Sequence, residues 1–318
     1  MPELPEVEVV RRGLAPAVDG AVVASVEVLD ERSLRRHVGG AFEGRLAGRR
    51  MLAPERRGKF LWIPLADSDD VTVQELPHAA PVEAVRPAAP KAETPEPREA
   101  LVVHLGMSGQ VLLREPGVDD ARARIRIDLE HPAHGPVRLN FVDQRIFGSM
   151  AIDRLVPAAD HPDEIIPSQV AHIARDPLDG RFDEARFLTR LETRRTTIKR
   201  ALLDQSLVSG IGNIYADESL WAARLHYDQP TWSISTRKAR ELLGEVRIVL
   251  RRALEEGGTS FDAQYVNVNG ASGYFSHSLR AYGQHGSPCS RCGRLIVREQ
   301  FMNRGSHFCP RCQRLRAA

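Results

Sequence analysis

The chain has 318 residues, 42% of them apolar and 27% charged, which is ordinary for a globular protein and long enough for two domains with separate cores. It contains no apolar run as long as a membrane span, and its amino end is acidic, unlike a secretory signal, so we expect a cytoplasmic protein. Residues 185–318 hold 21 Lys and Arg against 11 Asp and Glu. Such a basic half is typical either of a solvated surface or of a protein that binds a polyanion such as nucleic acid.

The first predicted element is a short helix over residues 3–18, with an interruption expected near Gly13 and Pro16. It opens with MPELPEVE, which places two prolines and three carboxylates within the first eight residues. The ordinary explanation of that composition is helix capping, because proline suits the first turn and acids complement the helix dipole.

Five strands are predicted next, from the segments AVVASVEVL, KFLWIPL, LVVHLGMSG, ARIRIDLE and VRLNFVD. In ARIRIDLE the apolar residues Ile125, Ile127 and Leu129 alternate with charged ones, as in a half-buried antiparallel strand. This half of the chain therefore predicts an antiparallel β-sandwich or barrel.

An insertion at about residues 67–99 interrupts these strands. Its later part holds six prolines and several acids, with too little apolar content to pack. We expect a disordered surface loop, and we expect the two strands that flank it to pair with each other.

After about Pro157 the pattern becomes helical, with apolar residues at 3.6-residue spacing in segments 182–193, 196–205, 213–225 and 235–258. Ser235 or Thr236 is a candidate N-cap for the last of these helices, and Gly257 follows its end.

The four cysteines form two C-x-x-C pairs, Cys289 with Cys292 and Cys309 with Cys312, separated by sixteen residues. This spacing predicts a tetrahedral four-thiolate zinc site, which is closed and therefore structural. Disulfides are the weaker reading, because nothing marks the chain as secreted. A turn between the pairs would project Arg304, either as a solvated residue or toward a phosphate.

Segment 197–221 predicts two helices joined by a turn that contains Gly210 and Gly212. The second helix begins at Asn213, where free N–H groups could bind a phosphate, and Lys199 on the preceding helix adds a cation. Glycine turns between helices are also common in proteins that bind nothing, so both readings stay open here.

Taken together, these motifs resemble those of the formamidopyrimidine-DNA glycosylase family (the Fpg/Nei group of base-excision repair enzymes). The matching segments occur in family order and cover nearly the whole chain: PELPEVE, RRGKF, HLGMSG, DQRIFG, DQSLVSGIGNIYADE, GYFSHSLRAYG and the cysteine finger. The resemblance implies an α+β fold of two domains. It implies an N-terminal β-sandwich with its helix (residues 1–156), a helix–two-turn–helix region (157–280) and a β-hairpin zinc finger (281–318) that holds one Zn²⁺.

The same resemblance assigns catalytic roles at the amino end. Removal of Met1 would free Pro2 as the nucleophile, with Glu3 as general acid and base, Glu6 as support, and Lys59 as an aid to base removal. The chemistry is consistent, because an α-amine has a pKa of about 7.7–8 and a secondary amine gives a permanently cationic iminium.

A further set of residues matches the family's DNA contacts. Met107, Arg145 and Phe147 would fill the space left by an extruded base. His104, Lys199, Asn213 and Arg304 would contact the DNA, the last three at phosphates. Core packing is the ordinary alternative for Met107 or Phe147 when each is considered alone.

The sequence departs from the family pattern in two places. Ile146 stands where the family often has a basic residue, and the proline-rich insertion is longer than expected. Segment 260–275 occupies the place of the family's lesion-recognition loop.

The resemblance implies a monomeric DNA glycosylase and abasic-site lyase, nucleoid-associated in a bacterium, whereas composition and spacing alone support only a zinc-containing protein that binds nucleic acid. It would excise 8-oxoguanine and formamidopyrimidines from duplex DNA and cleave the strand by β,δ-elimination. The alternatives are a Nei-like glycosylase for oxidised pyrimidines, against which PELPEVE argues, and a non-catalytic zinc-containing DNA-binding protein.

Overall fold

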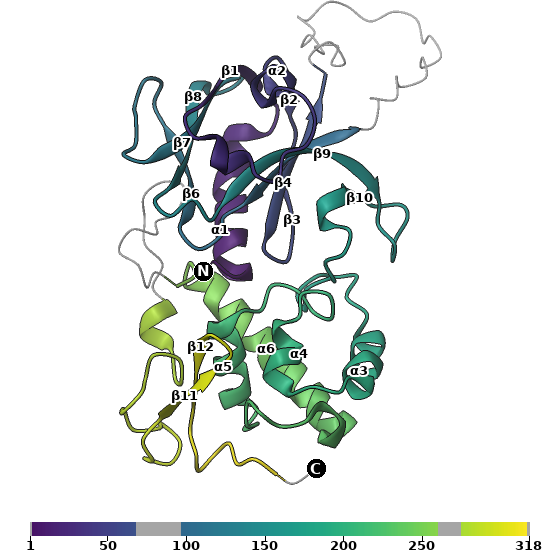
Figure 1. The fold of residues 1–318 in the computed structure, drawn as a ribbon, viewed down its shortest axis with the longest axis vertical. Coiled ribbons are helices and arrows are strands. Elements are labelled where there is room, and N and C mark those ends of the chain that lie inside the picture. The colour runs from purple at the N-terminus through teal and green to yellow at the C-terminus, as the bar shows by residue number, and fades with distance from the viewer. Residues whose placement is uncertain (1, 68–96, 260–274, 317–318) are drawn as a thin grey trace, which may run out of the picture.

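The computed structural model describes residues 2–67, 97–259 and 275–316. Its ribbon shows a sheet-rich N-terminal domain stacked on a helical C-terminal domain, with the amino end at the junction between them (Figure 1). None of the helices within those ranges combines the length and apolarity that crossing a membrane would need. The predicted α+β architecture of two domains is confirmed.

Helix α1 (Leu4–Val18) runs without a break from the domain junction into the N-terminal domain. The predicted interruption near Gly13 and Pro16 is wrong. Pro16 stands in the last turn, so its missing N–H and its ring affect only the final hydrogen bonds before the helix ends. Val10 and Leu14 lie on the buried face and fix the helix against the sheet.

Ten antiparallel strands form the sheet, which is ordered β10-β9-β5-β4-β2-β1-β7-β8-β6 with β3 paired to β4. The strands are β1 (Val22–Val28), β2 (Arg50–Met51), β3 (Glu55–Arg57), β4 (Phe60–Ala66), β5 (Glu99–His104), β6 (Gly109–Arg114), β7 (Ala123–His131), β8 (Gly135–Asp143), β9 (Ser149–Pro157) and β10 (Ile165–Pro167). All five predicted strands are present, whereas β6, β9 and the three short strands β2, β3 and β10 were not anticipated.

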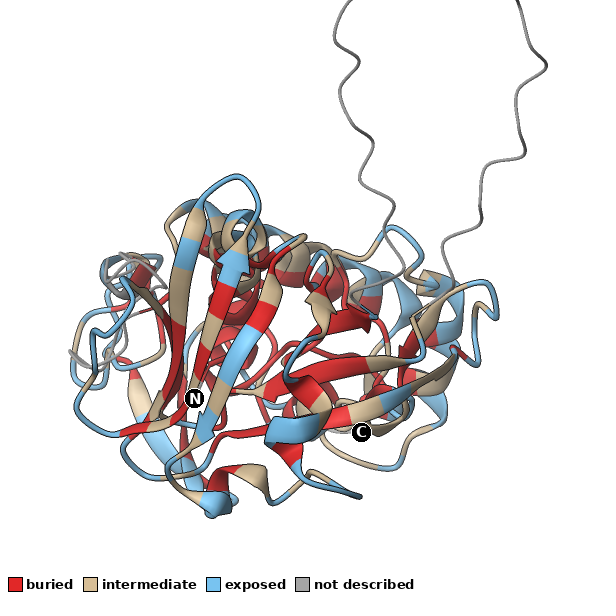
Figure 2. Ribbon diagram, turned by 90° about the horizontal axis from the view of Figure 1, so that it is seen from above, coloured by how far each residue is buried: buried red, intermediate tan, exposed pale blue. Residues whose placement is uncertain are grey.

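One apolar core joins the two ends of this sheet. Ile127 of β7 and Ile152 of β9 belong to the same buried cluster as Leu14 of α1. The sheet therefore folds over α1 into a sandwich, and Figure 2 shows buried positions gathered between the layers with exposed ones toward loops and strand ends.

The predicted pairing across the insertion is confirmed, because β4 and β5 are antiparallel neighbours with Phe60 opposite His104 and Leu65 opposite Glu99. Most of the insertion, residues 68–96, lies outside the described residues, as does nearly all of segment 260–275.

The C-terminal domain packs its helices around a second core. They are α3 (Glu184–Thr193), α4 (Ile198–Leu203), α5 (Asn213–Ala222) and α6 (Thr236–Glu255). The short helix α2 (Phe42–Leu46) belongs to the first domain with α1. Ser235 caps α6 by accepting a hydrogen bond from the Lys238 backbone N–H, as predicted. Gly257 has a positive φ just past the helix end, which ends the helix.

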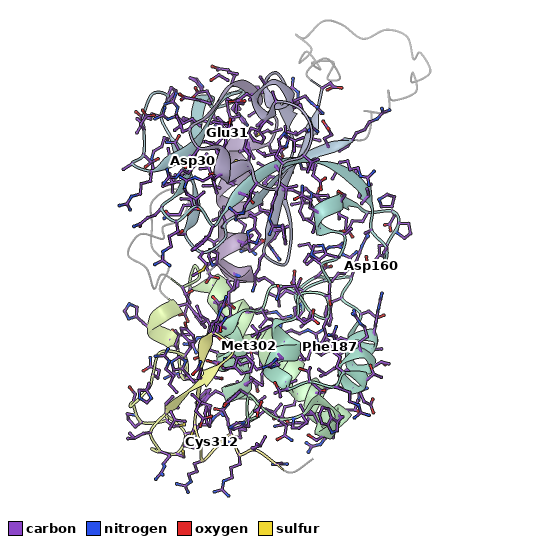
Figure 3. All side chains as sticks on the ribbon, in the orientation of Figure 1. Asp30, Glu31, Asp160, Phe187, Met302 and Cys312 are labelled. Carbon is purple, nitrogen blue, oxygen red and sulfur yellow. The ribbon has the colours of Figure 1, made fainter. Side chains whose placement is uncertain are left out.

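Strands β11 (Val297–Phe301) and β12 (Arg304–Phe308) form a hairpin that packs on α5. Its turn carries Met302, which lies on the side toward the first domain, while Cys312 lies at the far end of the molecule (Figure 3). The hairpin thus spans the distance between the cysteines and the domain junction.

Candidate active site

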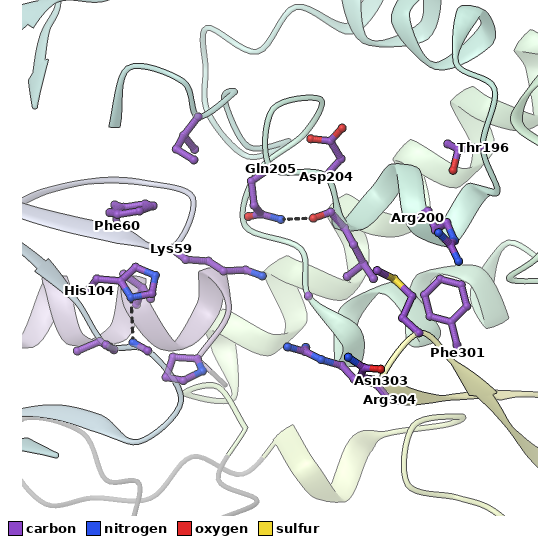
Figure 4. Close-up of a pocket in the computed structure, with 18 residues that line it drawn as sticks. Lys59, Phe60, His104, Thr196, Arg200, Asp204, Gln205, Phe301, Asn303 and Arg304 are labelled. Carbon is purple, nitrogen blue, oxygen red and sulfur yellow. Dashed lines mark hydrogen bonds between the residues drawn. The ribbon is translucent and has the colours of Figure 1, made fainter. Parts of the chain in front are cut away.

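A cleft of about 750 Å³ opens between the two domains and is lined by residues of both. The first domain contributes Pro2, Lys59 and His104, and the second contributes Gly212 and Arg304. In Figure 4 the side chains of Lys59 and Arg304 enter the cleft from opposite domains. The structure therefore brings together residues that the sequence separates by up to 302 positions.

Glu3 is held by the N-terminus of α5. Its carboxylate accepts the backbone N–H of Gly212 at 2.5 Å and that of Ile214 at 3.0 Å. The free N–H groups and the positive end of the dipole favour an anion here. The sequence analysis left open whether this helix end binds a phosphate, and in the structure the Glu3 carboxylate accepts its Gly212 and Ile214 N–H groups.

Burial raises the pKa of Glu3, and the nearby charge of Glu6 adds to the effect. The Lys59 ammonium and the backbone N–H groups act in the opposite direction. A carboxyl group with a raised pKa retains its proton to higher pH than usual, so Glu3 is suited to donate a proton as well as to accept one.

Glu6 lies one turn further along α1 and links three segments. One oxygen accepts the Glu3 backbone N–H at 2.8 Å, and the other accepts the Tyr215 hydroxyl at 2.6 Å. Thr259 donates both its N–H and its hydroxyl to Glu6, each at 2.8 Å. Glu6 therefore fixes the start of α1, where Pro2 and Glu3 lie, against the second domain.

The Lys59 ammonium donates to the Ile211 carbonyl at 2.9 Å, across the domain junction. Burial lowers the pKa of Lys59, which the Glu3 carboxylate opposes and the positive charge of Arg304 reinforces. Lys59 thus combines a position beside Glu3 with an ammonium that loses its proton more easily than an ordinary lysine.

Pro2 precedes α1 and is buried at the wall of the cleft. The hydrogen bond between the Glu3 N–H and Glu6 holds the residue that follows it. Any amine at Pro2 would therefore be fixed at the cleft beside Glu3, with little freedom to be lost on binding.

His104 closes one side of the cleft at the end of β5. Burial and the charge of Arg36 lower its pKa to about 4, so the ring is neutral at pH 7. Its Nδ1 accepts the Gly106 N–H at 3.2 Å, which leaves the ring proton on Nε2. His104 can therefore donate one hydrogen bond without carrying a charge.

Two adjacent loops of the first domain carry the predicted base-replacing residues. Met107, between β5 and β6, is 45% exposed, and Phe147, between β8 and β9, is 46% exposed. Arg145 is exposed beside Phe147. The core-packing alternative is wrong for both apolar residues, because neither is buried.

The sequence analysis did not anticipate what holds the loop of Phe147. The Asp143 carboxylate accepts the N–H groups of Arg145 at 3.1 Å and Gly148 at 2.6 Å. Arg35 donates to the carbonyls of Ile146, at 2.9 Å, and Phe147. Ile146 has a φ of 56°, which is uncommon for a β-branched residue, so these bonds hold a strained backbone.

The turn predicted between the cysteine pairs is confirmed, with Phe301 opposite Arg304 in the hairpin. Arg304 is exposed and faces the cleft. Asn213, the first residue of α5, is 7% exposed and donates its amide to the Gly305 carbonyl at 3.0 Å.

Lys199 is a correction to the sequence analysis. The side chain is fully buried, and its ammonium donates to Asp217 at 2.6 Å and to the Ser306 hydroxyl at 3.0 Å. A direct phosphate contact by Lys199 is therefore wrong for this structure, because its donors point into the protein.

The four cysteines gather as predicted. All four Sγ atoms lie within 4.8 Å of one another, and those of Cys292 and Cys309 are 3.5 Å apart. A tetrahedral ion with Zn–S bonds of about 2.3 Å separates its thiolates by about 3.8 Å, so the cluster fits zinc. The set leaves no open coordination position, so the ion would stabilise the finger.

Three parts meet around one cleft: a sheet domain with its N-terminal helix, a helix–two-turn–helix region and a zinc-binding hairpin. This combination defines a DNA-repair glycosylase. Comparison with known families agrees. The formamidopyrimidine-DNA glycosylase N-terminal domain matches residues 1–150, its H2TH domain matches 173–264, and the zinc finger found in this enzyme and in isoleucyl-tRNA synthetase matches 286–315. The chain belongs to the formamidopyrimidine-DNA glycosylase family of base-excision repair enzymes.

Curated relatives are similar over nearly their whole length. The formamidopyrimidine-DNA glycosylase of Leifsonia xyli is 59% identical, over 99% of this chain and 100% of its own. That of Streptomyces avermitilis is 49% identical, over 99% of this chain and 98% of its own.

Solved structures of the family share the fold. The Thermus thermophilus enzyme has a TM-score of 0.75 and 31% identity, over 99% of this chain and 100% of its own. The Lactococcus lactis enzyme bound to DNA with an abasic site has a TM-score of 0.75 and 27% identity, over 98% of this chain and 99% of its own. A Lactococcus lactis complex with oxidised-pyrimidine DNA has a TM-score of 0.76 and 27% identity, over 98% of this chain and 100% of its own.

Proposed function

We propose that this protein excises 8-oxoguanine and formamidopyrimidines from double-stranded DNA and then cleaves the abasic strand. The observation that supports this most strongly is the arrangement of Pro2, Glu3 and Lys59 at one interdomain cleft. The proposed partner is duplex DNA, in keeping with relatives solved with DNA that contains Fapy-dG or an abasic site. The protein would act as a monomer in the bacterial cytoplasm, associated with the nucleoid.

In the proposed reaction, removal of Met1 frees the secondary amine of Pro2. The nitrogen attacks the sugar C1′, the bond from C1′ to the base breaks, and the base leaves with a proton. Glu3 donates a proton to the ring oxygen O4′ as the sugar opens to an iminium. Lys59 lies within reach of the same carboxylate and would assist departure of the base.

Strand cleavage then follows from the iminium, which acts as an electron sink. Loss of a C2′ proton breaks the C3′–O bond, and loss of a C4′ proton then breaks the C5′–O bond. Water hydrolyses the remaining iminium, which releases the unsaturated sugar fragment as an aldehyde and restores the Pro2 amine. Both released phosphates take the electron pairs of the bonds that break, so the product is a gap with a phosphate at each end. Glu3 would carry the protons of these steps.

DNA recognition is assigned to groups around the cleft. Arg304 and Asn213 would contact phosphates, and His104 would donate its Nε2–H to another. Arg145 would pair with the cytosine left behind, while Met107 and Phe147 fill the vacated space.

A lesion panel tests the proposal. Single-turnover excision is measured on duplexes that contain 8-oxoguanine, a formamidopyrimidine, 5-hydroxycytosine or thymine glycol. We expect at least tenfold faster release of the purine lesions and product ends that carry phosphates. Faster release of the pyrimidine lesions would support an enzyme for oxidised pyrimidines. This is the second candidate, because a relative has been solved with DNA that contains an oxidised pyrimidine. Binding without excision would leave a DNA-binding protein.

A further inference from the structure

The carboxylate of Asp217 gathers donors from α4 and the zinc-finger hairpin. Asp217 is the fifth residue of α5 and is 1% exposed. One oxygen accepts the Lys199 ammonium at 2.6 Å and the Ser306 hydroxyl at 3.1 Å. The other accepts the His307 backbone N–H at 2.8 Å and lies 3.3 Å from the Nδ1 of the same residue. Three of these four contacts are to β12.

The partners of Asp217 are buried as well. Lys199 and Ser306 are fully buried, and His307 is 9% exposed. The Lys199 ammonium also reaches the Gly305 carbonyl at 3.4 Å and faces the Phe301 ring at 4.9 Å. Every residue from 305 to 307 is therefore held by Asp217, Lys199 or both.

This arrangement bears on Arg304, which directly precedes the clamped residues. Arg304 begins β12 and pairs with Phe301 across the hairpin turn. The ring of Phe301 is the one that the Lys199 ammonium faces. The side chain of Arg304 itself is exposed at the cleft. The backbone from which its guanidinium projects is thus continuous with the segment that Asp217 anchors.

We propose that Asp217 is a positioning residue, which anchors β12 through Lys199, Ser306 and His307 so that Arg304 meets a DNA phosphate. This inference rests on the phosphate contact of Arg304 in the proposed function. A carboxylate suits the role because it accepts all of these donors at once, whereas a neutral amide would present its own N–H groups to some of them. The buried ammonium of Lys199 also needs a counter-charge, since an unpaired buried charge is costly.

The test compares the salt dependence of duplex binding in four proteins, namely wild type, Asp217→Asn, Arg304→Ala and the double variant. Each phosphate contact contributes about −0.9 to the slope of log K against log [salt]. Arg304→Ala is expected to lower the magnitude of the slope by about 0.9 and to weaken binding about tenfold. Asp217→Asn is expected to do nearly the same, and the double variant no more than Arg304→Ala alone.

Two controls separate positioning from a general loss of structure. Glu192→Gln makes the same charge change at an exposed position of α3 and should leave the slope unchanged. Zinc content should stay at one ion per chain in Asp217→Asn. Ser306→Ala removes a single hydroxyl from the same cluster, so it should give a smaller loss in the same direction if Asp217→Asn does not fold.

The outcomes are distinguishable. A wild-type slope in Asp217→Asn, or losses that add in the double variant, would overturn the positioning role while leaving the Arg304 contact intact. A wild-type slope in Arg304→Ala would overturn that phosphate contact, and the positioning role with it, without affecting the excision chemistry measured on the lesion panel.

Discussion

Glu3 and Gly212 are 209 positions apart in the sequence, yet the Gly212 N–H donates to the Glu3 carboxylate at 2.5 Å. The contact joins the start of α1 to the start of α5 and therefore joins the two domains at the cleft. It gives the carboxylate partners on the opposite domain, so the position of the proposed general acid depends on how the domains are docked.

The first prediction concerns Gly212. A Cβ at this position would lie 2.3 Å from both the carboxyl carbon and an oxygen of Glu3. The φ of −125° is ordinary for any residue, so Gly212→Ala would act through this clash alone. We expect single-turnover excision to fall about 100-fold, because a shift of about 1 Å in a catalytic group has that order of effect.

Gly244→Ala is the matched control, since the added Cβ meets no atom within 4 Å apart from its chain neighbours and the backbone of its own helix. It stands inside α6, where alanine should stabilise the helix by about 0.5–1 kcal/mol and leave excision unchanged. Wild-type excision by Gly212→Ala would contradict the role of the Glu3 contact.

The second prediction concerns Phe147. Phe147→Ala removes an exposed ring that is placed to enter the base stack. Excision of 8-oxoguanine should fall at least tenfold, because extrusion costs a few kcal/mol that the ring would help to offset. Cleavage of a preformed abasic site should change less, since no base has to leave the stack. Leu29→Ala, at a residue of similar exposure, should affect neither reaction; equal losses on both substrates in Phe147→Ala would argue against the wedge.

The third prediction concerns His104, whose pKa falls from 6.5 to about 4 on folding. Between these values the unfolded chain binds more protons than the folded one, so this group makes stability fall as the pH drops from 6.5 toward 4. The slope is at most about 1.4 kcal/mol per pH unit. His104→Gln should remove this part of the acid sensitivity. Urea unfolding at pH 4–7 measures the free energy of unfolding of wild type and His104→Gln. If this free energy falls equally with pH in both proteins, His104 is not the source of the acid sensitivity.

The fourth prediction concerns the metal. Cys292→Ser removes one of the four thiolates, so the zinc content should fall and the hairpin should lose stabilisation on the order of 10 kcal/mol. DNA binding should weaken, while circular dichroism of the sheet domain should persist because its core is separate. Ser290→Ala lies in the same C-x-x-C pair and keeps all four thiolates, so it should retain one zinc and bind normally. Normal DNA binding by a zinc-free protein would refute this role.

Much of the fold follows from local pattern. The alternation of Ile125, Ile127 and Leu129 predicts β7, and the cysteine spacing predicts the metal cluster, because both signals are short-range and strong. Strands such as β2 and β10 were missed because two or three residues carry no periodicity. The continuity of α1 through Pro16 depends on packing against the sheet, which overrides local propensity.

The site was harder to predict where partners are distant. The resemblance singled out Glu3 and Lys59. No local signal showed that the Gly212 N–H would donate to Glu3. Nor did any local signal show that Lys59 would donate to the Ile211 carbonyl. Lys199 shows the converse error. A lysine on an amphipathic helix in a basic domain indicates a surface cation, and only the tertiary structure shows that Asp217 lies beneath it.

The most direct test of the central claim is borohydride trapping on a duplex with 8-oxoguanine opposite cytosine, using protein whose mass shows that it begins at Pro2. Reduction of the iminium should give a covalent adduct, and peptide mapping should place the DNA on the Pro2 nitrogen. Pro2→Gly serves as the companion variant and should trap less DNA. An adduct on a lysine such as Lys59, or lesion binding with neither adduct nor cleavage, would contradict the assignment of Pro2 as the nucleophile.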